Sequence, residues 1–182
     1  MTTLESRCLD AFPDWLRSLA DDARALAAVL ESEGSRVAQR QSAAALSYLF
    51  KSLDLIPDGL EDLGFIDDAF VVRAAADAVK LEGEAELAAD ATGTLARLAG
   101  EAELVKEFLG NEYERLSKYV AGLEHGSARG RSVANVLGDE NVRADFVREV
   151  REWAESYVAP GFARDQRNLI KLRSFLLAKL PA

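Results

Sequence analysis

Six acidic residues and no basic residue lie between positions 54 and 68, and this segment holds the side chains with the clearest chemical potential. They are Asp54, Asp58, Glu61, Asp62, Asp67 and Asp68. Apolar residues alternate with them, so the segment must be anchored to a hydrophobic core while its carboxylates stay hydrated or paired. Convergent carboxylate oxygens are what the hard cations Mg²⁺ and Ca²⁺ require. The segment is therefore the first candidate for a functional site.

One interpretation of the segment is purely structural. Asp54 can cap a short turn over residues 55–60, and Asp67 or Asp68 can place negative charge at a helix N-terminus. The remaining special residues suit a tight turn, because proline fixes φ and glycine permits unusual backbone angles; they are Pro57, Gly59 and Gly64. Under this interpretation each residue serves the backbone alone.

The second interpretation is a Mg²⁺ or Ca²⁺ site formed by Asp54, Asp58, Asp67 and Asp68. A helical hairpin could bring Asp54 or Asp58 close to the two later aspartates. The spacing differs from that of an EF-hand, in which the acids alternate before a glycine and a distant glutamate. Convergence of the carboxylates within about 5 Å would favour the metal site, whereas outward splay would leave only caps.

The order of residues here resembles the YkvA-like proteins, a family of small bacterial proteins of unknown function. Asp54-Leu-Ile-Pro-Asp58 matches the family's first motif, and Gly64-Phe-Ile-Asp-Asp68 matches its Gly-aromatic-aliphatic-Asp-Asp motif at the same spacing, with Tyr48 also in place. The resemblance covers about residues 36–80 and implies a helical hairpin closed by this turn, but no activity. The chain departs from the family at Ser52 and Glu61, where proline is usual.

Other chemically able residues give weaker signals. His125 is the only histidine, which argues against a histidine metal site or a Ser-His-Asp triad. Arg129 and Arg131 precede a predicted helix start at Ser132 and could contact an anion there. Cys8 is the single cysteine and shares a helical face with apolar residues, so we predict a buried structural thiol.

Near the C-terminus, three cations share one face of a predicted helix: Arg164, Arg167 and Lys171. A leucine stripe lies beside them at positions 169, 172, 176 and 180. Such a basic amphipathic helix can contact an anionic membrane surface or a partner groove. The alternative, which we favour, is that the stripe is part of the core and the cations pair with the acidic remainder of the chain.

The elements that must position these residues are predicted to be helices. The 182 residues are 49% hydrophobic, rich in Ala, Leu, Glu and Arg, and contain four prolines, which predicts an all-α fold. We expect a single compact bundle of about seven or eight helices over residues 1–182, with the YkvA-like hairpin at 36–80. A new helix should begin at Pro13 and end at Gly34, Ser35 should cap the next helix, and residues 122–131 should form a loop. Between residues 85 and 120, Gly93, Gly100 and Gly110 are candidate breaks.

Charge and hydropathy limit the possible functions. A net charge of -9 argues against a nucleic-acid partner. Neither an export signal nor an apolar run of the roughly 18 residues that a membrane span needs is visible, so we expect a cytoplasmic protein and no integral membrane segment. Our leading hypothesis is a non-enzymatic interaction or regulatory module with no cofactor other than Mg²⁺ or Ca²⁺; a protein partner and the oligomeric state stay open.

Two further hypotheses remain. One is a Mg²⁺- or Ca²⁺-dependent hydrolase or phosphoryl-transfer enzyme that uses the acidic segment, with Arg129 or Arg131 neutralising substrate charge. The other is a peripheral membrane protein that binds through residues 164–180.

Overall fold

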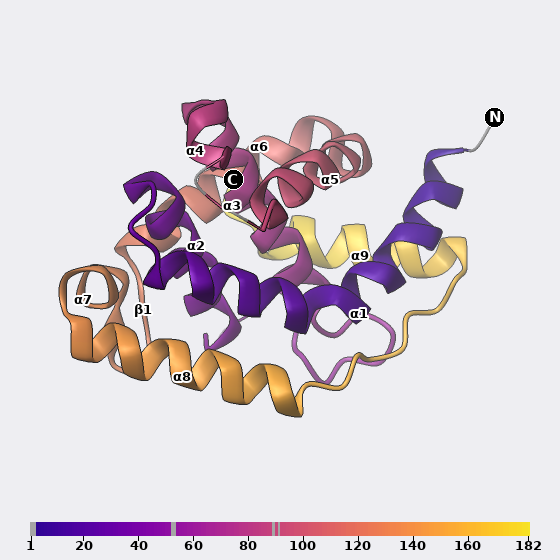
Figure 1. Cartoon of the computed structure of the whole chain (residues 1–182). Helices are drawn as coiled ribbons and strands as arrows, with labels where there is room; N and C mark the ends of the chain where they lie inside the picture. The colour runs from indigo at the N-terminus through magenta and orange to yellow at the C-terminus, as the bar shows by residue number, and fades with distance from the viewer. Residues whose placement is uncertain (1–2, 52–53, 89, 91) are drawn as a thin grey trace.

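The computed structural model describes residues 3–51, 54–88, 90 and 92–182, and it is predominantly helical (Figure 1). The all-α prediction is confirmed. The α-helices are α1 (Leu4–Glu31), α2 (Arg36–Leu49), α3 (Ile66–Glu82), α4 (Glu84–Ala88), α5 (Thr94–Leu109), α6 (Tyr113–Gly122), α7 (Val133–Gly138), α8 (Glu140–Ser156) and α9 (Gln166–Lys179). The described residues also contain two 3₁₀ turns, η1 (Gly110–Glu112) and η2 (Leu123–His125), and two short strands, β1 (Ser127–Ala128) and β2 (Arg131–Ser132).

Helix α1 is longer than the sequence predicted. It passes through Pro13 without a break, so the predicted helix start at that residue is wrong. An interior proline removes one backbone hydrogen bond and crowds the carbonyl four residues earlier, at a cost of about 3 kcal/mol. The turns on both sides of it, however, bury large apolar side chains, among them Phe12, Leu16 and Leu19. The helix also ends at Glu31 rather than at Gly34. Packing against the core therefore outweighs the local cost of the proline.

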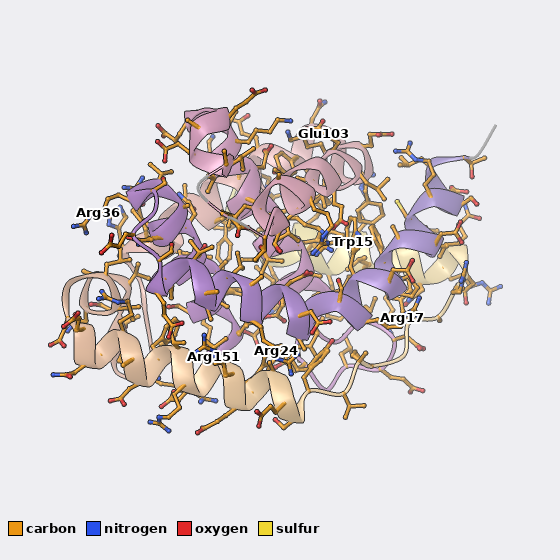
Figure 2. All side chains as sticks on the ribbon, viewed as in Figure 1. Trp15, Arg17, Arg24, Arg36, Glu103 and Arg151 are labelled. Carbon is orange, nitrogen blue, oxygen red and sulfur yellow. The ribbon has the colours of Figure 1, made fainter. Side chains whose placement is uncertain are left out.

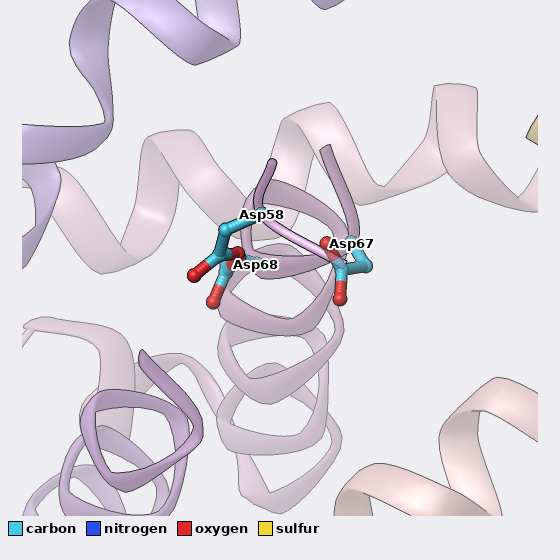
Figure 3. Close-up of side chains that lie close together, drawn as sticks. All are labelled: Asp58, Asp67 and Asp68. Carbon is cyan, nitrogen blue, oxygen red and sulfur yellow. The ribbon is translucent and has the colours of Figure 1, made fainter. Parts of the chain in front are cut away.

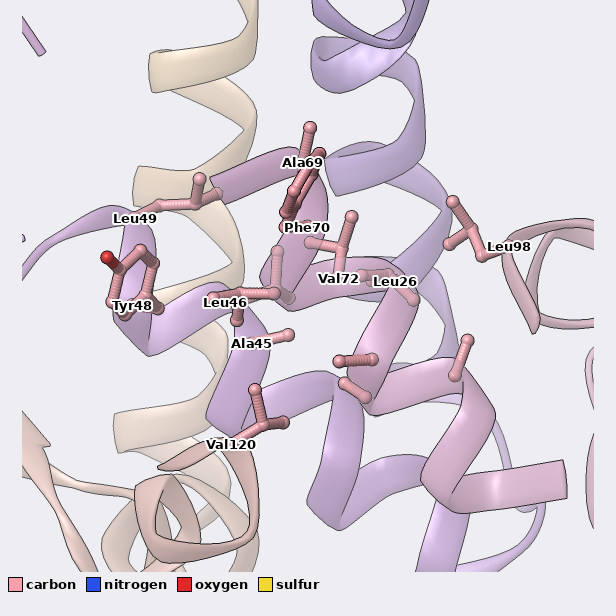
Figure 4. Close-up of a cluster of buried hydrophobic side chains, with 14 of the residues drawn as sticks. Leu26, Ala45, Leu46, Tyr48, Leu49, Ala69, Phe70, Val72, Leu98 and Val120 are labelled. Carbon is pink, nitrogen blue, oxygen red and sulfur yellow. The ribbon is translucent and has the colours of Figure 1, made fainter. Parts of the chain in front are cut away.

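Helix α3 lies at the centre of the molecule and packs against α1, α2, α5 and α6. Its buried residues run on all sides of the helix from Ile66 to Val79, which is expected of a helix surrounded by others. Figure 4 shows side chains of α2 and α3, such as Leu46 and Phe70, meeting in this core. The start of α3 is consequently held in a fixed place relative to α2.

Glycines mark the breaks on either side of α5. Gly93 precedes the helix with φ 70° and Gly110 follows it with φ 59°, backbone angles that only glycine adopts at low cost. The third candidate break, Gly100, lies inside α5. The loop predicted at 122–131 instead contains η2 and an antiparallel β-hairpin, in which Ser127 pairs with Ser132.

The last two helices close the core from different sides. Helix α8 runs beside α1, and an ion pair from Arg151 to Glu31 joins their surfaces (Figure 2). The leucine stripe of α9 and its continuation is buried, at Leu169, Leu172, Leu176 and Leu180. Of the three cations predicted to share one helical face, Arg167 and Lys171 lie on α9 and are exposed. Arg164 precedes α9 and pairs with Asp10, so its predicted place on the helix is wrong. The leucine stripe thus serves as core. No helix of the described residues is both long and apolar enough to traverse a bilayer.

Candidate metal centre

The loop between α2 and α3 folds back tightly on itself, and Gly64 makes this possible. We call residues 54–65 the acidic loop. A Cβ atom at Gly64 would lie 2.1 Å from the backbone carbonyl oxygen of Asp58, so only glycine fits. The amide of Gly64 donates to the carbonyl of Leu60 at 2.9 Å. The close contact between Gly64 and Asp58 brings Asp58 back to the first turn of α3.

Three aspartates meet at this point, and we call them the carboxylate cluster: Asp58, Asp67 and Asp68 (Figure 3). Each offers one carboxylate oxygen, and the three oxygens lie within 4.8 Å of one another. Asp67 and Asp68 are 0% and 2% exposed, whereas Asp58 is the most exposed of the three. Within the described part of the chain, this is the one group of three metal-ligand side chains that converge in this way.

The two oxygens of Asp67 have different surroundings. Oδ2 accepts hydrogen bonds from the Tyr48 hydroxyl at 2.5 Å and from the Ile56 amide at 3.1 Å. Oδ1 is buried and has no hydrogen-bond partner among the residues that the structure describes. The Tyr48 hydroxyl also accepts from the Leu55 amide at 2.7 Å. Asp67 is therefore oriented by α2 and by the loop, and one of its oxygens remains available.

Asp68 is similarly unsatisfied, because its Oδ2 is buried and no described residue forms a hydrogen bond with it. Burial, and then the charges of Asp67 and Asp58, raise the pKa of Asp68 well above its ordinary value. Burial also raises the pKa of Asp67, although the hydrogen bonds from Tyr48 and Ile56 oppose this rise. The cluster thus concentrates negative charge in a site where water is scarce, and ionisation there is unfavourable without a positive partner.

Asp54 lies outside the carboxylate cluster, unlike the four-residue site that the sequence suggested. Its Oδ1 is buried and makes no hydrogen bond with the described residues, so the expected cap on residues 55–60 is not formed by that atom. Burial and the charges of Asp58 and Asp67 raise the pKa of Asp54 to about 7, and Lys51 partly offsets this. Asp54 belongs to the electrostatic surroundings of the cluster.

The other turn residues lie where a tight loop needs them. Pro57 provides the carbonyl that accepts the Leu60 amide at 3.0 Å, and Gly59 lies within that turn with open space around it. Glu61 is exposed in the same loop, while Ser52 is outside the described residues. The structural tasks predicted for Pro57 and Gly64 are therefore compatible with a metal site, since the turn itself brings the aspartates together.

The remaining candidates are engaged elsewhere. Arg129 stacks over Phe50 at 4.3 Å from the ring centroid, and Arg131 pairs with Glu149. His125 is exposed beside Glu124. Cys8 is fully buried, as predicted, and burial raises its pKa to about 11.

The sequence pattern did not reveal several buried charged residues, and the largest of them is Arg73. It is 0% exposed, stacks on Trp15 at 4.0 Å from the ring centroid, and forms an ion pair with Glu101 at 2.7 Å. In the sequence Arg73 lies in an otherwise apolar helical stretch, which was the only available signal. Its partners come from α1 and α5, so the network joins three helices.

Comparison with known proteins agrees with the resemblance noted in the sequence. The family described as "Protein of unknown function (DUF1232)" matches residues 42–73, a segment that includes Tyr48 and the whole carboxylate cluster. The YkvA-like resemblance is thus confirmed over this short segment. No curated protein and no solved structure matches the chain.

Proposed function

We propose that this protein is a helical module that binds one divalent cation, Ca²⁺ or Mg²⁺, at Asp58, Asp67 and Asp68. The observation that carries the proposal is the pair of buried carboxylate oxygens, Asp67 Oδ1 and Asp68 Oδ2, that accept no hydrogen bond from the described residues and belong to two aspartates of one cluster. Buried carboxylates are normally paired or metal-bound, because leaving them unpaired costs several kcal/mol.

The spread of the three oxygens suits a hard cation. Oxygens on opposite sides of Ca²⁺, each at about 2.4 Å, lie roughly 4.8 Å apart, which equals the upper limit found for the cluster. Mg²⁺, with bonds of about 2.1 Å, needs the oxygens within roughly 4.2 Å of one another. The 4.8 Å bound on these distances is therefore compatible with Ca²⁺, and water would supply the remaining ligands on the side of Asp58.

A bound ion would connect parts of the chain that are distant in sequence. Tyr48 of α2 and Ile56 of the acidic loop both donate to Asp67 of α3, and Asp58 adds the middle of the loop. An ion at the cluster would lock these three elements together, so its role in the proposal is regulatory and non-enzymatic. This extends the interaction or regulatory module that the sequence favoured.

Titration calorimetry with Ca²⁺ and with Mg²⁺ tests the proposal on chelator-treated protein. The wild type should bind one ion per chain, and the double variant Asp67→Asn/Asp68→Asn should bind none. Glu61→Gln is the matched control, since it removes an exposed acid from the same loop and should bind like the wild type. If the wild type gives no heat and no thermal stabilisation with either ion, the proposal is rejected.

A further inference from the structure

A segment near the C-terminus lies across the acidic loop. We call residues 157–165, which connect α8 to α9, the strap. In Figure 1 this yellow-orange segment passes close to the purple acidic loop, below α1. The strap begins at Tyr157, whose hydroxyl donates to the Leu16 carbonyl of α1 at 2.8 Å. Further along, the ring of Phe162 meets Phe12 of α1 edge to face at 6.0 Å. The strap is therefore attached to α1 at two points.

Three contacts join the strap and the two helices that flank it to the acidic loop. The Tyr157 ring packs edge to face on Phe65 with 5.3 Å between centroids, and Trp153 of α8 lies 6.2 Å from the same ring. The buried side chain of Asn168 uses its amide nitrogen twice, donating to the Asp62 carbonyl at 3.0 Å and to the Ala163 carbonyl of the strap at 3.2 Å. Asn168 thus connects the strap and the loop directly.

These contacts fall on the two residues of the loop whose backbone is least favourable. Asp62 and Phe65 have φ of 64° and 63°, and each such angle costs a non-glycine residue of order 1 kcal/mol. Outside contacts must hold them in place. Both residues flank Gly64, whose contact with the Asp58 carbonyl brings Asp58 to the carboxylate cluster. The contacts from Tyr157, Trp153 and Asn168 therefore stabilise the loop conformation on which the carboxylate cluster depends.

We infer that the strap is coupled to the cation site through two positioning residues, Tyr157 and Asn168. The hydrogen bonds that the structure describes for these two residues do not involve the side chains of the carboxylate cluster. The inference rests on the proposed cation binding. Coupling is reciprocal: a bound ion should tighten the strap, and loosening the strap should weaken ion binding. Both residues lie outside the segment 42–73 that matches the family, so the regulation belongs to the rest of this chain.

The test compares the full-length wild type, Asn168→Ala and a matched control, Arg167→Ala, which removes an exposed neighbour on the same helix. Without cation, amide hydrogen exchange in residues 54–68 should be faster in Asn168→Ala than in the other two proteins. By calorimetry, Asn168→Ala should bind Ca²⁺ roughly 5- to 50-fold more weakly, with one ion per chain retained. In the wild type, Ca²⁺ should slow exchange in residues 157–165.

Each result separates the inference from the proposed function. Unchanged Ca²⁺ affinity and unchanged loop exchange in Asn168→Ala would overturn the coupling while leaving cation binding intact. No Ca²⁺ binding by the wild type would overturn cation binding and the coupling together. If Asn168→Ala does not fold, Tyr157→Phe replaces it, because it removes only the hydroxyl that anchors the strap. Faster strap exchange and weaker Ca²⁺ binding would then support the coupling, and wild-type behaviour in both would overturn it.

Discussion

Replacement of Asp67 by asparagine is expected to stabilise the cation-free protein at neutral pH, although the residue is fully buried. The asparagine side-chain oxygen can still accept from Tyr48 and Ile56, as Oδ2 does now. Its amide nitrogen then takes the place of Oδ1, which has no partner within the described part of the chain, and so replaces a buried unpaired acceptor with a donor. The variant removes one buried negative charge and leaves the shape of the site unchanged.

The size of the effect follows from the pKa of the Asp67 carboxyl, which folding raises from 3.8 to about 6. Ionisation of such a group disfavours the folded state by about 3 kcal/mol once the pH exceeds the folded-state pKa. The asparagine loses a favourable charge at the start of α3, worth up to about 1 kcal/mol. The net gain expected above pH 7 is therefore roughly 1 to 3 kcal/mol, or about 3 to 10 °C in Tm for a chain of this length.

Urea unfolding of both proteins from pH 3.5 to 8, in the presence of chelator, measures this gain. Because folding raises the pKa of Asp67, the stability that its neutral form contributes is fully present below pH 3.8 and is lost as the pH rises through about 6. The two stability curves should thus meet near pH 4 and separate above it. Saturating Ca²⁺, at about 100 times its Kd, should add about 2.7 kcal/mol to the wild type only. If Asp67→Asn is the less stable protein at pH 7.5 without cation, the buried charge is already compensated and the reasoning fails.

Two further substitutions test the loop. Gly64→Ala should destabilise the protein by about 2 kcal/mol or more and weaken Ca²⁺ binding, because its Cβ would lie 2.1 Å from the Asp58 carbonyl oxygen. Gly59→Ala is the control in urea unfolding, since no described atom lies within 4 Å of its Cβ. Equal losses of stability in the two variants would contradict the explanation. Tyr48→Phe removes the acceptor of the Leu55 amide and a donor to the cluster, and should cost about 1 to 3 kcal/mol. A calorimetric Tm equal to that of the wild type would show that this hydroxyl contributes nothing.

The helical fold was largely predictable because apolar periodicity and capping residues are local signals. Ser35 caps α2 by accepting from the Ala38 amide, as its position predicted. The helix start predicted at Pro13 was wrong, since the energy that keeps α1 continuous comes from side chains packed against other helices. The β-hairpin after η2 was also missed, because two-residue strands carry too short a pattern to be recognised.

The candidate site was predicted in outline, and its details depend on tertiary contacts. The sequence pointed to the correct segment, and three of the four aspartates converge. It could not show that Asp54 lies outside the group, because that depends on how the loop turns back at Gly64. Sequence motifs could not identify Asn168, since it forms its hydrogen bond with Asp62, which lies 106 positions earlier in the chain.

Cation binding at the carboxylate cluster is measured most directly by anomalous scattering from crystals of the wild type grown with Mn²⁺, a hard cation that prefers oxygen ligands. We expect a single strong anomalous peak within roughly 2.5 Å of carboxylate oxygens from Asp58, Asp67 and Asp68, and no such peak in Asp67→Asn/Asp68→Asn. A wild-type map with no peak at the carboxylate cluster under saturating Mn²⁺ would contradict cation binding there.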